Sequence, residues 1–400
     1  MSIGFLTLIV LALAALGWIG ARQRALSLAG GDARVLHSLP GQHGQSVALM
    51  TALPALAVMA LLLVVQTLTG RAVAAPVIVG AVIAAAVAGL AFGLLRQTRD
   101  YRARNVAERM VIGLLILASL VAVLTTIGIV ASLLFETIHF FELYPFSKFF
   151  FSTIWNPQFR GGSDLGIWPL IWGTMYVSAI ALLVAVPIGL MSAIYLSEYA
   201  SKTARGWIKP AIEILAGIPT IVYGLFALIT VGPLLRDYFA QPLGLGSSSS
   251  SVMTAGLVMG VMVIPFVSSL SDDIINAVPQ SLRDGSLALG ATSAETVKQV
   301  VLPAALPGIV GAILLAASRA IGETMIVVMG AGAAAKLSLN PFEAMTTVTV
   351  KIVSQLTGDT EFASPETLVA FALGLTLFLI TLVLNVLALV IVRKYREQYE

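Results

Sequence analysis

Long apolar segments dominate this chain of 400 residues and limit the folds that it can adopt. About nine of them reach the length of roughly 20 residues that a helix needs to cross the hydrocarbon core of a bilayer. Lipid offers the backbone no hydrogen-bond partner, so a spanning segment must be a helix or a strand of a closed barrel. The segments are continuously apolar and lack the alternation of barrel strands. We therefore expect an all-α integral membrane protein.

The basic residues of the loops orient these spans. The expected spans are Ile3 to Gly20, Val47 to Leu68, Val73 to Leu95, Met110 to Phe135, Ile167 to Leu196, Ile212 to Leu235, Val252 to Leu270, Leu306 to Gly330 and Leu368 to Val392. The basic clusters fall on one side of this path, at Arg22 to Arg34, Arg96 to Arg109, Lys202 to Lys209 and Arg393 to Arg396. By the positive-inside rule that side is cytosolic, which places Met1 outside and the C-terminus in the cytosol.

The composition excludes several classes of function. Only 11% of the residues are charged, against about a quarter in a soluble domain, and the basic clusters are explained by topology rather than by nucleic-acid binding. The chain has 0 cysteines and 3 scattered histidines, so we expect no metal site. It has no nucleotide-binding P-loop motif. We expect no cofactor and no enzymatic activity, and any ATP must be bound by a partner subunit.

Polar residues divide the chain into two parts. Residues 1–105 contain about three apolar segments that are almost free of polar residues, which is typical of packing and lipid contact. Residues 106–400 contain about six, with polar, Gly and Pro residues inside the spans, and we expect function there. The outer stretch from Phe135 to Trp168 is rich in aromatic residues and is expected to lie at the bilayer interface, with a docking surface for a soluble partner as the alternative.

A polar loop at residues 271–303 separates two apolar spans on the cytosolic side. Its core reads Asp284-Gly285-Ser286, three residues, Gly290, nine residues, Val300, one residue, Leu302-Pro303. We expect two short helices joined at Gly290, which permits backbone angles closed to other residues. We expect Leu302-Pro303 to end the second helix, because a residue before proline avoids the helical region. A cytosolic loop of this kind is best explained by contact with another protein.

This spacing resembles the EAA loop of ABC importer permeases, with Asp, Gly and Ser in place of the initial Glu, Ala and Ala. A second stretch, LAGIPTIVYG with Gly217, Pro219, Tyr223 and Gly224, resembles the permeases of phosphate-specific (Pst) importers. The segment from Arg319 to Met325, RAIGETM, is similar to the PstC type of subunit rather than to the PstA type. The likeness covers about Met110 to Glu400, and the first hundred residues resemble an extension that some PstC chains carry.

The resemblance implies a type I permease core of about six helices, preceded by about three extra ones. It implies a multi-pass protein of the bacterial inner membrane that works with a second, PstA-like permease, two PstB-like ATP-binding subunits and a periplasmic PstS-like phosphate-binding protein. In that family the EAA loop sits in a cleft of the ATPase subunit. Inorganic phosphate would be the substrate and membrane lipid the surroundings.

Arg319 and Glu323 are candidate residues of the translocation path, because ionisable groups at membrane depth are costly and are usually paired or functional. Four residues apart on one helix, they would share a face and reach each other. A guanidinium can bind two phosphate oxygens at once, and Glu323 could accept a bond from a protonated one. Thr324, next in the motif, is placed in the same path. An ion pair that only fixes helix packing is the structural alternative.

Other functions remain open at this point. A proton-coupled secondary anion carrier would use Glu323 as its titrating group, and it would need no ATPase. A PstA-type subunit, or an importer of molybdate, tungstate or sulfate, would have the same architecture, because an arginine fork binds any tetrahedral oxyanion. A membrane anchor or signalling partner without transport activity is a further alternative.

Overall fold

The structure is a computed structural model that describes residues 3–70, 73–158, 162–358 and 364–396. Within these residues nine helices are long and apolar enough to cross a membrane, and each overlaps an expected span. The predicted all-α membrane fold is thus confirmed. By proximity the chain forms two compact units, residues 1–128 and 129–400. The domain boundary expected at residue 105 stays a prediction.

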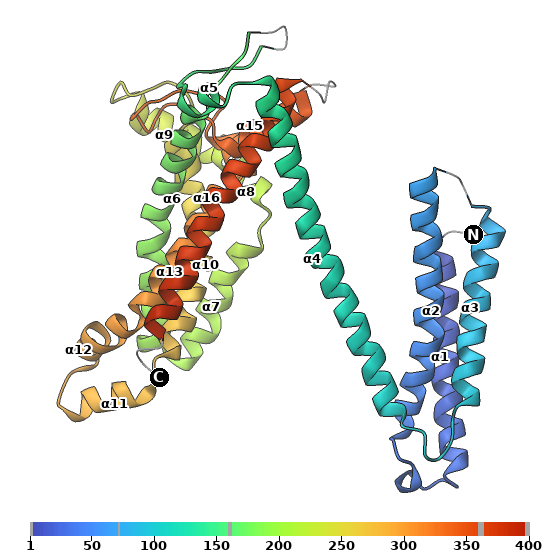
Figure 1. The fold of residues 1–400 in the computed structure, drawn as a ribbon. Coiled ribbons are helices and arrows are strands. Elements are labelled where there is room, and N and C mark those ends of the chain that lie inside the picture. The colour runs from blue at the N-terminus through green and yellow to red at the C-terminus, as the bar shows by residue number, and fades with distance from the viewer. Residues whose placement is uncertain (1–2, 71–72, 159–161, 359–363, 397–400) are drawn as a thin grey trace. The chain divides into compact units, whose positions relative to one another are not determined.

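The first unit is a bundle of three antiparallel helices with the first half of a fourth (Figure 1). The bundle consists of α1 (Ile3–Leu28), α2 (Pro40–Thr69) and α3 (Ala75–Leu95), with a short 3₁₀ turn at Ala33–Val35 and α4 (Ala103–Leu143) following. Small residues let the helices approach closely. A Cβ added to Gly89 of α3 would lie 2.0 Å from the carbonyl oxygen of Met50 in α2.

The second unit is built around the pair α6 (Trp168–Ile194) and α10 (Val252–Ala277). Gly189, Gly256 and Gly260 lie in their interface, where an added Cβ would come within 3.0 Å of a side chain of the facing helix. The close contact buries most of α10. Helices α13 (Leu302–Ile321) and α16 (Pro365–Arg396) pack against each other beside this pair. Helix α10 is therefore the central helix of the second unit, and other elements pack against it.

Aromatic residues close one end of this unit. The end contains α5 (Phe146–Phe151), α15 (Val348–Gly358) and a two-stranded antiparallel ribbon, β1 (Trp155–Asn156) with β2 (Asp164–Leu165), in which Trp155 faces Leu165. Phe140 and Phe149 are fully buried and pack in one cluster with residues of α16. The expected interfacial segment is therefore in part a folded cap, although Phe146 and Phe151 remain exposed.

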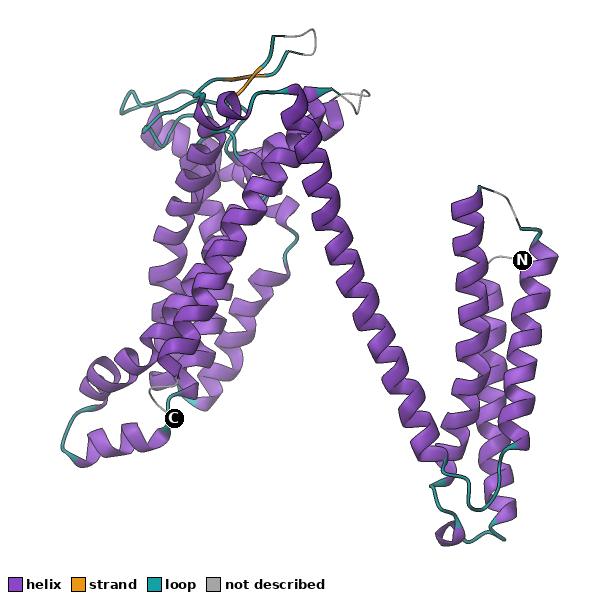
Figure 2. Cartoon of the chain, in the orientation of Figure 1, coloured by secondary structure: helices purple, strands orange, loops and turns teal. Residues whose placement is uncertain are grey.

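Two expected spans are interrupted, contrary to the sequence-based expectation. In the region of the span expected at Ile212 to Leu235, α7 (Lys202–Gly217) and α8 (Thr220–Phe226) are separated by a non-helical link (Figure 2). Helix α8 then continues through a π-helical turn (Ala227–Val231), α9 (Gly232–Leu235) and a second π-helical turn (Arg236–Ala240). The span expected at Leu306 to Gly330 ends as α13 at Ile321 and resumes as α14 (Met325–Gly330). Gly217 and Pro219 lie at the first break and Glu323 and Thr324 at the second, but the mean hydropathy of each stretch still predicted one span across the break.

Candidate translocation and coupling sites

The first break contains the LAGIP sequence. Gly217 is the last residue of α7, Ile218 is extended, and Pro219 precedes α8. Because the helix stops, carbonyl groups of its last turn lose their intrahelical partners. The hydroxyl of Tyr223 donates to one of them, the Leu215 oxygen, at 2.8 Å. Tyr223 thus stabilises an interruption that would be costly at membrane depth.

The second break, at residues 322–324, lies between α13 and α14. A carboxylate oxygen of Glu323 accepts a hydrogen bond of 3.1 Å from the backbone N–H of Met325, in the first turn of α14. Thr349 of α15 donates to the backbone oxygen of Glu323 at 2.8 Å. The Thr324 hydroxyl makes a long local contact to the Gly322 oxygen. The carboxylate of Glu323 therefore caps a helix, and its backbone is held by a separate element.

The two breaks are brought together by the packing of α8 on α14. Gly224 lies in this contact, and an added Cβ would be 2.8 Å from the Met329 sulfur and 3.0 Å from the Met325 carbonyl oxygen. Hence the family motif residues near 217–224 and those near 319–325, which are far apart in sequence, meet in space. In many secondary transporters, interrupted helices that meet in this way hold the substrate.

Arg319 and Glu323 do not form the expected ion pair among the described residues. The four-residue spacing brings side chains together only on a continuous helix, and α13 ends at Ile321. The exposed guanidinium of Arg319 instead lies 5.8 Å from the centre of the Phe266 ring of α10. Stacking against a ring leaves the N–H groups at the edge of the guanidinium free. In this arrangement Arg319 can bind an anion while Glu323 performs a different task.

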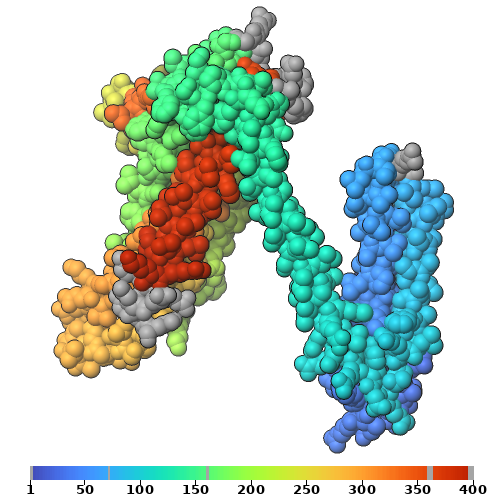
Figure 3. Space-filling model, viewed as in Figure 1, coloured from blue at the N-terminus to red at the C-terminus, as the bar shows by residue number. Residues whose placement is uncertain are grey.

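The polar loop projects from the second unit as a helical knob (Figure 3). Helix α11 (Gln280–Ala288) and α12 (Ser293–Thr296) flank Gly290, whose φ of 88° lies in the left-handed region. Both short helices and the role of Gly290 agree with the expectation. The hydroxyls of Ser286 and Thr296 bond at 2.9 Å and join the two helices.

The end of the loop was predicted wrongly. A π-helical turn, Val297–Val301, joins α12 to α13, so Leu302 and Pro303 begin α13 instead of ending a helix. The wide turn, in which Val300 lies, relieves the clash of the proline ring with the carbonyl one turn earlier. This polar loop, the candidate coupling loop, is therefore continuous with α13 through one helical turn.

The surface of α11 is unusual for a loop outside the membrane. None of its side chains is buried, and Asp284 and Gly285 are exposed. Leu289, directly after α11, has 93% of its surface exposed, and Leu287 is also exposed. The two exposed leucines, two residues apart on a polar loop, offer a protein partner a small apolar surface.

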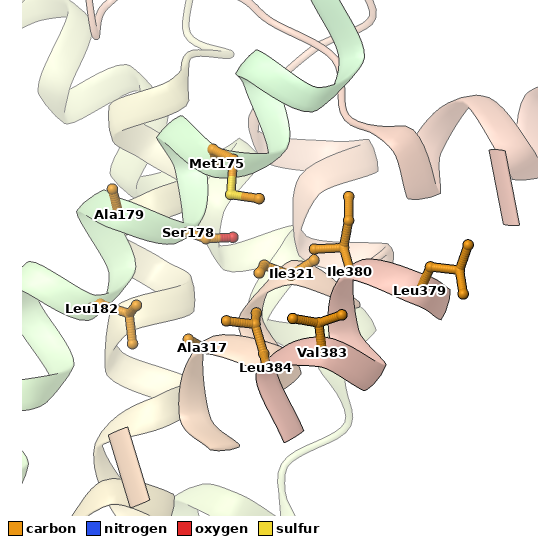
Figure 4. A pocket seen from close by; sticks show the side chains of 10 residues that line it. All are labelled: Met175, Ser178, Ala179, Leu182, Ala317, Ile321, Leu379, Ile380, Val383 and Leu384. Carbon is orange, nitrogen blue, oxygen red and sulfur yellow. The ribbon is translucent and has the colours of Figure 1, made fainter. Parts of the chain in front are cut away.

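An apolar groove of about 560 Å³ runs between α6, α13 and α16 (Figure 4). Among its lining residues Ser178 supplies the only hydroxyl group. The others are apolar, such as Met175, Leu182 and Ile321. The groove offers an anion no charged group. We therefore do not assign the substrate to this groove.

Five charged residues meet near the base of the polar loop, which the sequence did not predict, although two of them belong to an expected basic cluster. They are Glu198, Arg205, Lys209, Asp272 and Arg283. The available signal was Asp272 itself, a carboxylate at the end of an apolar span, where an unpaired charge is rare. Their partners could not be identified, because they lie 63 to 85 residues apart in sequence.

Two family models match parts of this chain. A family model described as "Binding-protein-dependent transport system inner membrane component" matches residues 185–397, which include both breaks and the coupling loop. The chain belongs to this permease family. A second model, described as "Phosphate ATP-binding cassette transporter", matches residues 7–76 in the first unit of the permease. The permease is thus a multi-pass inner-membrane transport subunit and not an enzyme, and separate subunits hydrolyse ATP.

Curated relatives are similar over most of their own length. Phosphate transport system permease protein PstC 1 of Mycobacterium tuberculosis is 36% identical over 278 residues, which cover 62% of this chain and 81% of that protein. PstC of Mesorhizobium japonicum is 33% identical and covers 68% and 86%. The probable ABC transporter permease protein YqgH of Bacillus subtilis is 33% identical and covers 62% and 76%. The PstC-type resemblance predicted from the motifs is confirmed.

Solved structures of other importers are more distant. A bacterial alginate ABC transporter, in complex with an alginate-bound periplasmic protein, is 16% identical with a TM-score of 0.49, covering 70% of this chain and 94% of that chain. The methionine transporter MetNI, in an inward-facing conformation, is 18% identical with a TM-score of 0.42, covering 57% and 93%.

Proposed function

We propose that this permease forms one half of the translocation path of an ATP-driven phosphate importer. A PstA-like permease would form the other half, two PstB-like subunits would bind ATP, and a periplasmic PstS-like protein would deliver phosphate. The similarity to PstC proteins supports the substrate. The observation that carries the proposal is the coupling loop, a rigid knob with exposed leucines whose second helix runs directly into α13.

The substrate path is proposed to pass the two helix breaks. Arg319 would contact phosphate through its free guanidinium edge, and Glu323 and Thr324 would shape the break next to it. A single guanidinium group would bind phosphate weakly enough to release it again, as a site on a translocation path must. Such a step needs no covalent chemistry and no cofactor on this chain.

The orientation is proposed from the charges. The end of the second unit that carries α11, α12 and the end of α16 would face the cytosol, and the end with α5 and α15 would face the periplasm (Figure 1). Lys202, Arg205 and Arg393 lie at the proposed cytosolic end, as the positive-inside rule requires. Met1 would then lie outside and the C-terminus inside.

The decisive experiment is uptake of labelled phosphate into vesicles that contain the four kinds of subunit, with and without internal ATP. Replacing Leu287 and Leu289 by serine should weaken docking of the ATPase about tenfold or more, because each leucine would lose its burial. ATP-driven uptake should fall accordingly, while insertion of the permease is unchanged. Leu339→Ser, at a leucine in the outer connection that is 78% exposed, is the control.

The alternative functions predict different results in the same vesicles. Uptake by this chain alone, abolished by an uncoupler and independent of ATP, would establish a proton-coupled carrier. ATP-dependent uptake of molybdate or sulfate in place of phosphate would keep the architecture and change the substrate. The leucine substitutions affect uptake only if the loop transmits the action of an ATPase.

A further inference from the structure

Arg283 ties the start of the coupling loop to the second unit. Its side chain, only 12% exposed, donates to the backbone oxygens of Ile275 and Val278 at 2.7 and 2.6 Å. These carbonyls belong to the C-terminal end of α10, where intrahelical partners are missing. A third bond, of 3.0 Å, joins Arg283 to Glu198, which is 14% exposed and lies in the π-helical turn (Tyr195–Tyr199) that follows α6. Helix α11 is therefore fastened to the ends of both central helices.

Asp272 forms a second charged junction one turn earlier on α10. Its side chain is 1% exposed, and both carboxylate oxygens accept from Arg205 at 3.0 and 2.9 Å. Lys209 donates to it at 2.7 Å and Asn276 at 2.9 Å. A buried carboxylate needs such partners, since an uncompensated charge in the interior costs several kcal/mol.

The two cations belong to α7, the inner half of the interrupted span. None of the α7 side chains is buried, so apolar packing holds this half-helix only weakly. Arg205 and Lys209 attach it to α10 through Asp272. At its other end α7 stops at the break, where Tyr223 holds the Leu215 carbonyl. A displacement of α7 would therefore reach the first break directly.

We propose that Asp272 is a positioning residue for coupled transport. In this mechanism α11 moves with the ATPase, Arg283 and Glu198 pass the movement to the inner ends of α6 and α10, and Asp272 pulls α7 through Arg205 and Lys209. The break at Gly217 to Pro219 then changes its angle beside α14. This inference rests on the proposed importer function and adds the route by which the loop acts on the path.

The number of phosphate ions transported for each ATP hydrolysed distinguishes a relay from an ion pair that only stabilises the fold. Loss of structure lowers ATP hydrolysis and phosphate uptake together, because both scale with the amount of folded complex. Loss of coupling lowers the phosphate moved for each ATP hydrolysed, while hydrolysis continues. The ratio of the two rates, measured in the complete complex in vesicles, is therefore the informative quantity.

The test compares Asp272→Asn with Asp273→Asn. Asparagine keeps the shape of the buried side chain and removes the charge that holds α7. Asp273 is the adjacent residue, 69% exposed, and its distance of 3.9 Å to Lys209 makes it a marginal partner. We expect the phosphate to ATP ratio to fall about tenfold for Asp272→Asn, a typical size of coupling between sites, and to stay at the parental value for Asp273→Asn.

Two further variants keep the inference testable if Asp272→Asn fails to assemble. Arg205→Gln keeps the bond between Lys209 and the Asp272 carboxylate. The complex should therefore fold and show a phosphate to ATP ratio between those of the parent and Asp272→Asn. Asp272→Glu retains the charge and should recover most of the ratio. An unchanged ratio in Arg205→Gln and Asp272→Asn, or a proportional fall of both rates, would overturn the relay. Absence of ATP-dependent phosphate uptake by the parent complex would instead reject the proposed function.

Discussion

At the scale of single residues, Arg319 and Glu323 have different surroundings although they were expected to act as a pair. The guanidinium of Arg319 rests near Phe266 with its edge free, whereas the carboxylate of Glu323 is engaged at the start of α14. Only Arg319 is arranged to bind an anion. The proposed roles therefore differ, with Arg319 contacting phosphate and Glu323 shaping the break beside it.

Arg319→Ala should reduce ATP-dependent phosphate uptake at least about tenfold, because a hydrogen bond to a charged group contributes about 1.5 to 3 kcal/mol. Arg319→Lys should recover only part of the uptake, since an ammonium lacks the planar fork. The measurement is the initial rate of uptake at equal amounts of inserted protein. Arg96→Ala is a matched control, because Arg96 also lies over a ring, that of Phe92, but in the first unit. Parental uptake by Arg319→Ala would contradict a role in the path.

At the scale of elements, the breaks of two spans meet in the second unit through the packing of α8 on α14. Each break has its own stabilising bond, from Tyr223 in one case and from Glu323 in the other. A helix that stops inside the membrane exposes polar backbone groups, which must find partners. Because these partners are side chains, the breaks can be altered by a single substitution.

Glu323→Gln should retain most of the uptake, because an amide oxygen can still accept the bond from the Met325 N–H. Glu323→Ala removes this cap, and loss of a capping side chain costs about 1 kcal/mol, so we expect a lower unfolding temperature and slower uptake. Thermal unfolding of the purified permease and uptake in vesicles test both variants. A carrier that protonates Glu323 would lose transport in Glu323→Gln as completely as in Glu323→Ala.

At the scale of the whole molecule, two units of different character share one chain. The first is a tight bundle of small apolar residues, with no charged side chain among its buried residues in the described part of the chain. The second contains the breaks, the coupling loop and the buried carboxylate of Asp272. The expected roles of an accessory extension and a permease core stay predictions for these two units.

Single cysteines can test the proposed orientation of the whole chain, because the protein has 0 native cysteines. Thr67→Cys and Ser247→Cys lie at proposed outer ends, whereas Gln23→Cys and Ser281→Cys lie at proposed cytosolic ends, and all of these side chains are exposed. A membrane-impermeant thiol reagent should label the outer pair in intact cells. It should label the inner pair only after the membrane is opened. The reverse pattern would overturn the orientation.

The sequence by itself determined the number and approximate positions of the spans and the two-helix form of the coupling loop. These features depend on local signals, namely runs of apolar residues and the glycine at position 290. The motifs also identified the family, because their spacing is a property of the chain alone.

Only the tertiary structure decided where the spans are interrupted and which charges meet. The break after Gly217 lies within apolar sequence, and it persists because Tyr223 and the packing of Gly224 on α14 stabilise it. The four-residue spacing of Arg319 and Glu323 predicted an ion pair, but α13 ends at Ile321, before Glu323. Asp272 found partners 63 and 67 residues away, on a different helix. Contacts between distant segments depend on the packing of whole helices, and no local pattern records them.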